Sequence, residues 1–192
     1  MLYALYNAIA AEQNKEINPV FELSKFGECS EPLFNFDISS LPVDLFRFTI
    51  ERNRHVQGEW RSVIATLFPG YFFFECDKDM VSEVRARLDE ELNKGQRIKQ
   101  QLPLISIPQE LSDLLYELCD QQHHISMSKG IIVNGMAHVT EGPLMGYDNR
   151  IVRIDRHKRL AWLKYSENIT RDFSKNSTST LVAGLEITER VS

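Results

Sequence analysis

Apolar residues recur with helical spacing in only two long stretches of this sequence, and this pattern constrains the fold more than any other feature. The first stretch predicts a helix over 79–92, with apolar positions at Val81, Val84, Leu88 and Leu92. The second predicts a helix that begins at Pro108, with one apolar face made by Leu111, Leu114, Leu115 and Leu118. No helical period follows residue 120, so helices and strands are segregated along the chain.

Short apolar segments bounded by Pro and Gly predict the strands. Candidate strands lie at 2–6, 43–50, 63–76 with a break at Pro69-Gly70, 102–107, 136–140, 150–155, 160–165 and 180–188. A weaker helix is expected at 7–15, and a polar stretch at 120–135 is interpreted as a linker. The sequence therefore predicts an α+β fold: an N-terminal domain at 1–119 with helices on an antiparallel sheet, a linker at 120–135, and a small all-β barrel at 136–192.

The composition is that of an ordinary globular protein. The chain has 192 residues, of which 43% are apolar and 26% charged, and its longest apolar runs fall far short of the roughly 20 residues that span a bilayer. Three cysteines (Cys29, Cys76 and Cys119) form no CxxC pair, and the N-terminus carries no cationic signal-peptide region. We therefore expect a cytoplasmic protein without membrane contact.

Motifs that would carry catalysis or hold a cofactor are missing from the sequence. The histidines show no HxxxH spacing, no loop resembles GxxxxGK[ST] or GxGxxG, and no nucleophile elbow surrounds a serine. Asp89-Glu90-Glu91 lies on the polar side of a predicted helix, and His123-His124 lies in the expected linker, where a surface loop is the simplest interpretation. We expect a protein that is not an enzyme and that binds no metal or cofactor.

Positive charge is concentrated in one segment of an acidic chain. The net charge is −5, but residues 1–118 carry 12 Lys and Arg against 19 Asp and Glu, whereas residues 119–192 carry 10 against 8. Within "RIVRIDRHKRLAW", at 150–162, apolar and charged residues alternate before a dense cationic turn at 155–159, and an apolar run resumes at Leu160. A solvated hairpin tip explains this pattern, and so does a focused contact with phosphate.

A second unusual segment is "LFPGYFFFEC", at 67–76. Strand alternation places Tyr71, Phe73 and Glu75 on one face and Phe72, Phe74 and Cys76 on the other, so both faces are aromatic. A central strand that is buried on both sides would show this pattern. So would a strand with one aromatic face exposed for a protein partner.

Taken together, these segments resemble the NusG family of transcription elongation factors, which join an N-terminal NGN domain to a C-terminal KOW domain. The stretch 138–165 has the layout of a KOW motif, with Gly142 and Gly146 in its loop, and "LFPGYFFFECD" resembles the NGN domain. The segments "EGPLMGY", "RIVRIDRHKRLAW" and "LVAGLEI" are most similar to the specialised LoaP-type paralogues. Leu2-Tyr3 departs from the tryptophan-tyrosine pair that usually opens the family's first strand, and the segments 18–42 and 166–179 look extended.

This resemblance implies a function without catalysis. The NGN domain of the family binds the clamp helices of the largest RNA polymerase subunit and suppresses pausing and termination. By match to the family motif, contact with RNA polymerase is expected from Tyr6, Phe68, Pro69, Tyr71 and Phe73. The cationic turn of the KOW domain is expected to bind a hairpin of nascent RNA, and so to recruit the protein to particular operons, through Arg153, Arg156, His157, Lys158, Arg159 and Lys164.

Two other functions remain open from the sequence. KOW barrels also occur in ribosomal proteins, so a ribosome-associated RNA-binding module would explain the cationic turn, although it leaves the aromatic strand without a role. A general elongation factor of the same family, acting at most genes, would explain both domains. We expect a monomer in either case, and a ribosomal protein or a termination factor is an additional candidate partner of the KOW domain.

Overall fold

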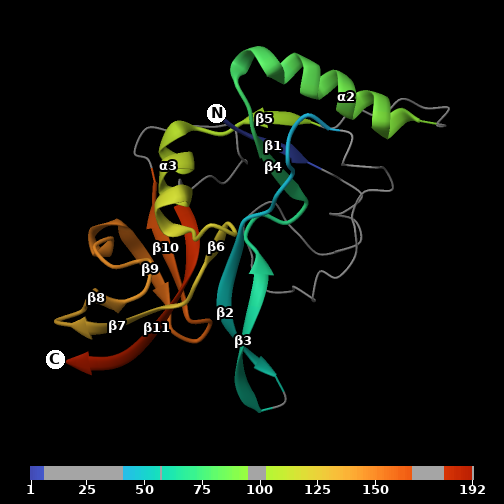
Figure 1. Cartoon of the computed structure of the whole chain (residues 1–192). Coiled ribbons are helices and arrows are strands. Elements are labelled where there is room, and N and C mark those ends of the chain that lie inside the picture. Colours follow the sequence, from blue (N-terminus) through green and yellow to red (C-terminus); the bar gives the residue numbers. More distant parts are fainter. Residues whose placement is uncertain (7–40, 57, 95–102, 166–179, 192) are drawn as a thin grey trace.

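The computed structural model describes residues 1–6, 41–56, 58–94, 103–165 and 180–191, and these form a mixed α+β fold (Figure 1). The expected helix at 7–15, residues 18–40 of the extended segment 18–42 and the polar loop 166–179 lie outside the described residues. The described elements are, in order, β1 (Leu2–Tyr6), β2 (Thr49–Val56), β3 (Glu59–Thr66), β4 (Tyr71–Glu75), η2 (Lys78–Met80), α2 (Val81–Asn93), β5 (Leu104–Ser106), α3 (Gln109–Leu118), β6 (His124–Ile125), β7 (Ser128–Val133), β8 (Met136–Glu141), η3 (Asp148–Arg150), β9 (Ile151–Asp155), β10 (Leu160–Lys164) and β11 (Thr180–Val191).

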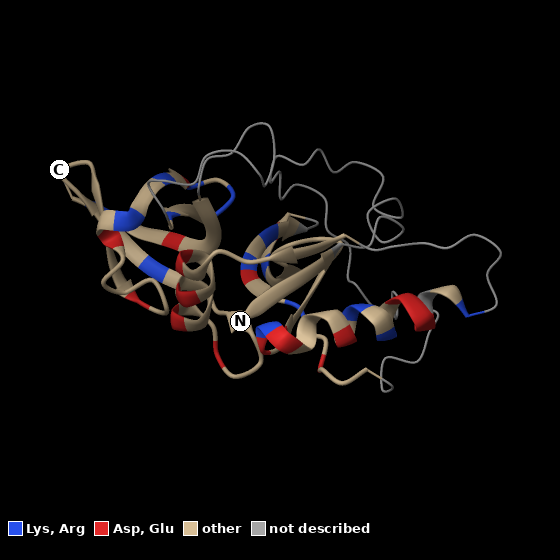
Figure 2. Cartoon of the chain, turned by 90° about the horizontal axis from the view of Figure 1, so that it is seen from above, with Lys and Arg blue, Asp and Glu red and all other residues tan. Residues whose placement is uncertain are grey.

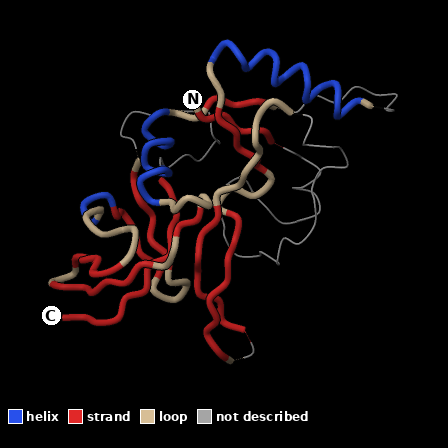
Figure 3. The backbone as a smooth tube through the Cα atoms, viewed as in Figure 1, coloured by secondary structure: helices blue, strands red, loops and turns tan. Residues whose placement is uncertain are grey.

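The two strongly periodic segments form α2 and α3, as predicted, and the break at Pro69-Gly70 separates β3 from β4. The strand expected at 43–50 is wrong in its position. Phe46 makes only an isolated bridge with Phe73, and continuous pairing starts at Thr49, where β2 turns away to form a long hairpin with β3. Figure 3 shows this hairpin projecting away from the helices.

The first sheet, in the order β4-β1-β5, is covered on both faces. On one face, Tyr3 and Leu5 of β1 join Phe72 and Phe74 of β4 in a cluster with α2. On the other face, Leu2, Ala4 and Phe73 belong to the larger core that includes the α3 leucines. β4 is therefore buried on both sides, as one interpretation predicted, but it is an edge strand of this sheet and not a central one.

The C-terminal sheet has the order β8-β7-β11-β10-β9, with β7 and β11 parallel and the other pairs antiparallel. Its strands confirm those predicted after residue 136, but 120–135 is not irregular, because it contains β6 and β7. The predicted closed barrel is also wrong for the described strands, since the edge strands β8 and β9 do not pair. Residues 142–150, including η3, separate these two strands where a tight hairpin would have paired them.

The two halves of the chain share one core. Leu115 of α3, Phe73 of β4 and Leu163 of β10 belong to the same buried cluster, so α3 packs against both regions. At the junction, a Cβ added to Gly184 of β11 would lie 2.4 Å from the backbone oxygen of Glu51 in β2. This close approach requires a residue without a side chain. Within the described ranges, no helix is both long and apolar enough to cross a membrane.

Candidate nucleic-acid and protein interfaces

The β9–β10 turn, residues 156–159, presents the centre of the cationic segment to solvent. Arg156, His157 and Lys158 are exposed, and the backbone N–H of Lys158 donates to Asp155 Oδ1 over 2.9 Å. Arg159 ends the turn with a φ of +53°. The aspartate fixes the turn through the backbone, which leaves the side chains of Arg156 and Lys158 pointing away from the core-forming strands.

Arg159 is engaged differently from its neighbours in the turn. Its guanidinium lies 4.4 Å from the ring centre of Trp60, on β3, and Nη1 lies 2.7 Å from Glu186 Oε1, on β11. Cations bind the face of an indole ring favourably, and partial burial strengthens both contacts. Arg159 therefore connects the turn to the β2–β3 hairpin rather than projecting with Arg156 and Lys158.

The two predicted RNA-binding residues outside the turn lie on the flanking strands. The guanidinium of Arg153 on β9 lies 4.6 Å from the ring centre of Trp162, its neighbour on β10. Lys164 is exposed at the other end of β10. Trp162 is half-buried and packs against the core, as expected for a structural tryptophan. The structure thus groups Arg156, His157 and Lys158, with Arg153 and Lys164 set back along the strands.

The predicted polymerase-binding residues whose side chains are described divide into half-buried and buried positions. Phe73 is only 3% exposed, so the expectation that it presents its ring to a partner is wrong. Its ring lies 4.9 Å from that of Phe48 and 5.4 Å from that of Phe68, and Phe46 stacks beside it. The segment that leads into β2 supplies this cover, and strand alternation within β4 could not reveal it.

Phe68, Pro69 and Tyr71 are half-buried and lie together at the β3–β4 turn. The backbone N–H of Tyr71 donates to the Phe68 oxygen over 3.1 Å, and Gly70 closes the turn with a φ of +79°. Tyr6 pairs with Tyr71 in the β1–β4 register, although its side chain is outside the described part of the structure. These four positions lie at the same end of the first sheet, where β1 ends and β4 begins.

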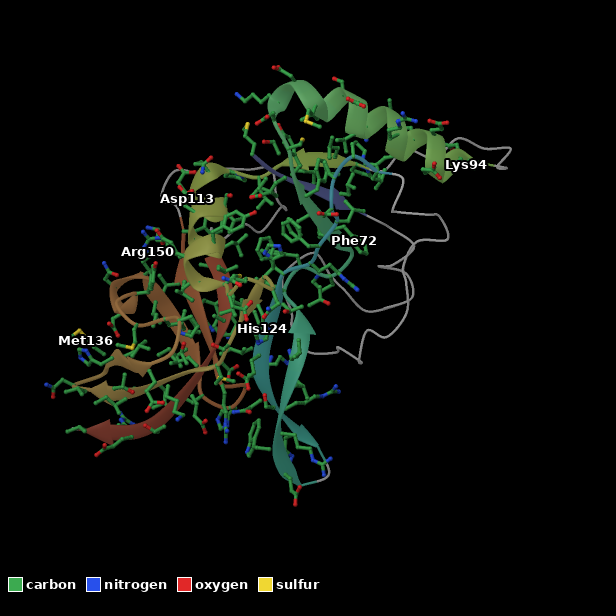
Figure 4. All side chains as sticks on the ribbon, in the orientation of Figure 1. Phe72, Lys94, Asp113, His124, Met136 and Arg150 are labelled. Atoms are coloured by element: carbon green, nitrogen blue, oxygen red, sulfur yellow. The ribbon has the colours of Figure 1, made fainter. Side chains whose placement is uncertain are left out.

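His123 and His124 are more constrained than a surface loop would make them. The ring of His123 lies 3.7 Å from that of Phe46, with a backbone φ of +58°. His124 forms part of β6, and its Nδ1 lies 2.9 Å from the Thr49 hydroxyl (Figure 4). The interpretation as a loop residue is therefore wrong for His124, which the pairing of β6 with β2 places in a strand. His123 does lie in the turn before β6, but it is half-buried against Phe46.

Glu51 links the β2–β3 hairpin to the segment before β7, and the sequence did not indicate this role. The Ser62 hydroxyl donates to Oε1 over 2.5 Å, and the backbone N–H of Met127, which precedes β7, donates to Oε2 over 2.9 Å. These hydrogen bonds, the one from Ser62 first, hold the pKa of the Glu51 carboxyl below its usual value. A second long-range link is the hydrogen bond that the Tyr147 hydroxyl donates to Glu117 Oε2 of α3 over 2.6 Å. No local sequence pattern marks either contact, because each joins residues that are distant in the chain.

The described residues offer no candidate metal site, and comparison with known proteins does not indicate a family. No group of three His, Cys, Asp or Glu side chains within the described ranges could hold a metal ion. The chain matches no protein-family model and no curated protein at a significant level.

Proposed function

We propose that this protein is a transcription antitermination factor of the NusG type, similar to the LoaP paralogues, that acts in the cytoplasm. In this proposal, residues 1–119 bind the clamp helices of RNA polymerase and suppress pausing and termination. The C-terminal region, proposed as a KOW domain at 136–192, binds a hairpin in nascent RNA and recruits the protein to particular operons. The observation that carries the proposal is the exposed cationic turn of Arg156, His157 and Lys158.

The chemistry of the turn suits an RNA backbone. An arginine can bind a phosphate through two parallel hydrogen bonds, and a lysine adds a mobile point charge. The phosphates of a folded RNA are read largely by shape, so a rigid turn that holds its cations outward is an appropriate contact. Arg153 and Lys164 extend the positive charge along the same two strands.

The polymerase contact is proposed for the end of the first sheet, where Phe68, Pro69, Tyr71 and Tyr6 lie. A few apolar and aromatic side chains commonly dominate the binding energy of a protein interface. Phe73 would hold the Phe68 ring in place through their contact in the core, without touching the partner.

The RNA contact is tested by exchanging two cations of the turn. Replacing Arg156 and Lys158 by Ala together should weaken binding to an RNA hairpin and reduce the dependence of log K on log salt by about two counterions. Lys78→Ala with Arg87→Ala, two exposed cations near or on α2, is the charge-matched control and should leave binding unchanged. Unchanged affinity and salt dependence in the turn variant would disprove the RNA contact.

The polymerase contact is tested by readthrough of a terminator with purified RNA polymerase. Tyr71→Ala should abolish the readthrough that the protein stimulates, whereas Tyr71→Phe, which keeps the ring, should retain most of it. Circular dichroism should show both variants folded. Full readthrough by a folded Tyr71→Ala protein would remove this assignment, and co-purification with ribosomes instead of polymerase would favour the ribosomal alternative.

A further inference from the structure

The contact between Arg159 and Trp60 joins two cationic segments that are about 100 residues apart in the sequence. The turn 156–159 belongs to the C-terminal sheet, and Trp60 belongs to the β2–β3 hairpin of the N-terminal half. The close approach of Gly184 to Glu51 and the hydrogen bond from Met127 to Glu51 hold the same two regions together. In Figure 2, Lys and Arg positions, coloured blue, mark both the turn and the neighbouring hairpin.

The hairpin itself carries positive charge beside an exposed aromatic ring. In its register, Arg54 lies opposite Arg61 and His55 lies opposite Trp60. Arginines directly across a strand pair repel each other and raise the local positive potential. Glu59 pairs with Arg61, Glu186 pairs with Arg159, and Glu51 accepts from Ser62 and Met127. Residues 49–66 therefore keep a small excess of positive charge, with three arginines against two glutamates.

Trp60 has the geometry of a stacking platform. Its side chain is 44% exposed although Arg159 lies over the ring, and the His55 ring meets it in a T-shaped contact at 5.2 Å. A tryptophan that served only to close the junction between the two halves would be expected to be almost completely buried, whereas a large part of the Trp60 surface stays open to solvent. An indole held by an arginine, with surface left open, can instead accept a nucleobase in a mixed stack.

We propose that the β2–β3 hairpin and the β9–β10 turn form one RNA-binding surface, in which Trp60 stacks with an unpaired base next to an RNA stem. The turn holds the backbone of the stem through Arg156 and Lys158, and Arg159 positions the indole. An unpaired base is required because the bases of a duplex are already stacked on each other. This inference rests on the proposed RNA contact of the turn and adds the single-stranded flank as a second determinant of affinity.

The closing experiment compares three RNA probes: a blunt hairpin, the same hairpin with an eight-uridine single-stranded extension at its 5′ end, and the same hairpin with this extension at its 3′ end. The wild-type protein should bind one of the extended probes more tightly than the blunt one. Trp60→Ala should remove this gain, so that the affinity for the extended probe falls at least about fivefold. The affinity for the blunt probe should stay unchanged. Trp60→Phe should keep part of the gain.

Ile64→Ala is the matched control, because Ile64 lies on the same face of β3 and is also exposed but cannot stack. It should leave the gain intact, and an equal loss in both variants would overturn the stacking role. A gain that persists in Trp60→Ala would also overturn it, while loss of blunt-hairpin binding in the turn variant would still support the RNA contact proposed above. The two proposals therefore fail separately.

A direct readout comes from the fluorescence of Trp60. The chain has two tryptophans, so Trp162→Phe leaves Trp60 as the single emitter. Saturation with oligouridine should quench this emission, because a stacked base quenches an indole. Emission that stays constant at saturation would overturn the inference, even if affinity were unaffected.

Discussion

The β4 strand and the β9–β10 turn are the two most unusual segments of the sequence, and the structure places them in opposite environments. β4 is packed on both faces, by α2 on one side and by Phe46, Phe48 and the shared core on the other. The turn carries Arg156 and Lys158 outward and is fixed through a backbone contact with Asp155. An excess of aromatic residues therefore does not specify exposure, whereas a dense charge run does, because burial of unpaired charges costs far more than burial of rings.

The largest expected effect concerns the packed side of this comparison. Phe73→Ala removes a ring that is in contact with three other aromatic side chains, and it should lower the free energy of unfolding by roughly 3–5 kcal/mol. Tyr71→Ala, at the half-buried position two residues earlier, should cost clearly less. Urea denaturation of both variants measures the difference, and equal costs would show that β4 is not more buried at its centre than at its edge.

The next effect is acid sensitivity at the junction of the two halves. The pKa of Glu51 is lowered in the folded protein, so its contribution to stability is complete above the ordinary value of 4.5 and is lost as the pH falls through the folded-state pKa. Glu51→Gln should cost about 1–2 kcal/mol at neutral pH and should flatten the loss of stability in acid. Thermal unfolding between pH 3 and 7 tests this.

Glu59→Gln is the control for the acid effect, since Glu59 lies on the same hairpin in an exposed ion pair with Arg61. It should change neither the stability at neutral pH nor the shape of the acid profile. An identical acid profile for wild type and Glu51→Gln would show that Glu51 does not couple the hairpin to the C-terminal sheet.

A smaller effect is expected where the turn touches the hairpin. Arg159→Ala removes the contacts with Trp60 and Glu186 and should lower stability by about 1 kcal/mol. In the Trp162→Phe background, the emission of Trp60 should also shift to longer wavelength, because water replaces the guanidinium. Unchanged emission would mean that Arg159 does not hold the indole in solution.

The smallest effect on stability belongs to the exposed side of the comparison. Replacing Arg156 and Lys158 by Ala should change the free energy of unfolding by less than about 0.5 kcal/mol, because neither side chain packs against the core. The same variant is expected to lose RNA affinity, so function and stability separate here. A large loss of stability would indicate that the turn is a structural element and would weaken its proposed role.

Local pattern was sufficient for most of the elements. Both helices follow from the spacing of their leucines and valines, and the β9–β10 hairpin follows from the alternation before the cationic turn and the apolar run after it. The turn also kept its predicted exposure, because a short charged loop has few ways to be buried.

Tertiary contacts explain what the sequence could not supply. β7 was hidden in a polar stretch because it pairs with β11, more than 50 residues later, and Phe73 was misjudged because Phe46 and Phe48 cover it from another segment. Likewise, nothing near Trp60 in the sequence indicates Arg159 as its neighbour. Each of these features depends on a long-range contact and leaves no period or spacing to read.

The position of β11 at the end of the described chain affects how the C-terminal sheet folds during synthesis. Residues 185–191 pair with β7, and residues 180–184 pair with β10, so one strand completes both parts of the C-terminal sheet. The β7–β8 and β9–β10 hairpins can form as they leave the ribosome, but each presents an unpaired edge until β11 emerges. These edges are therefore open to molecular chaperones until β11 is available, and a block in translation before residue 180 should yield an aggregation-prone fragment.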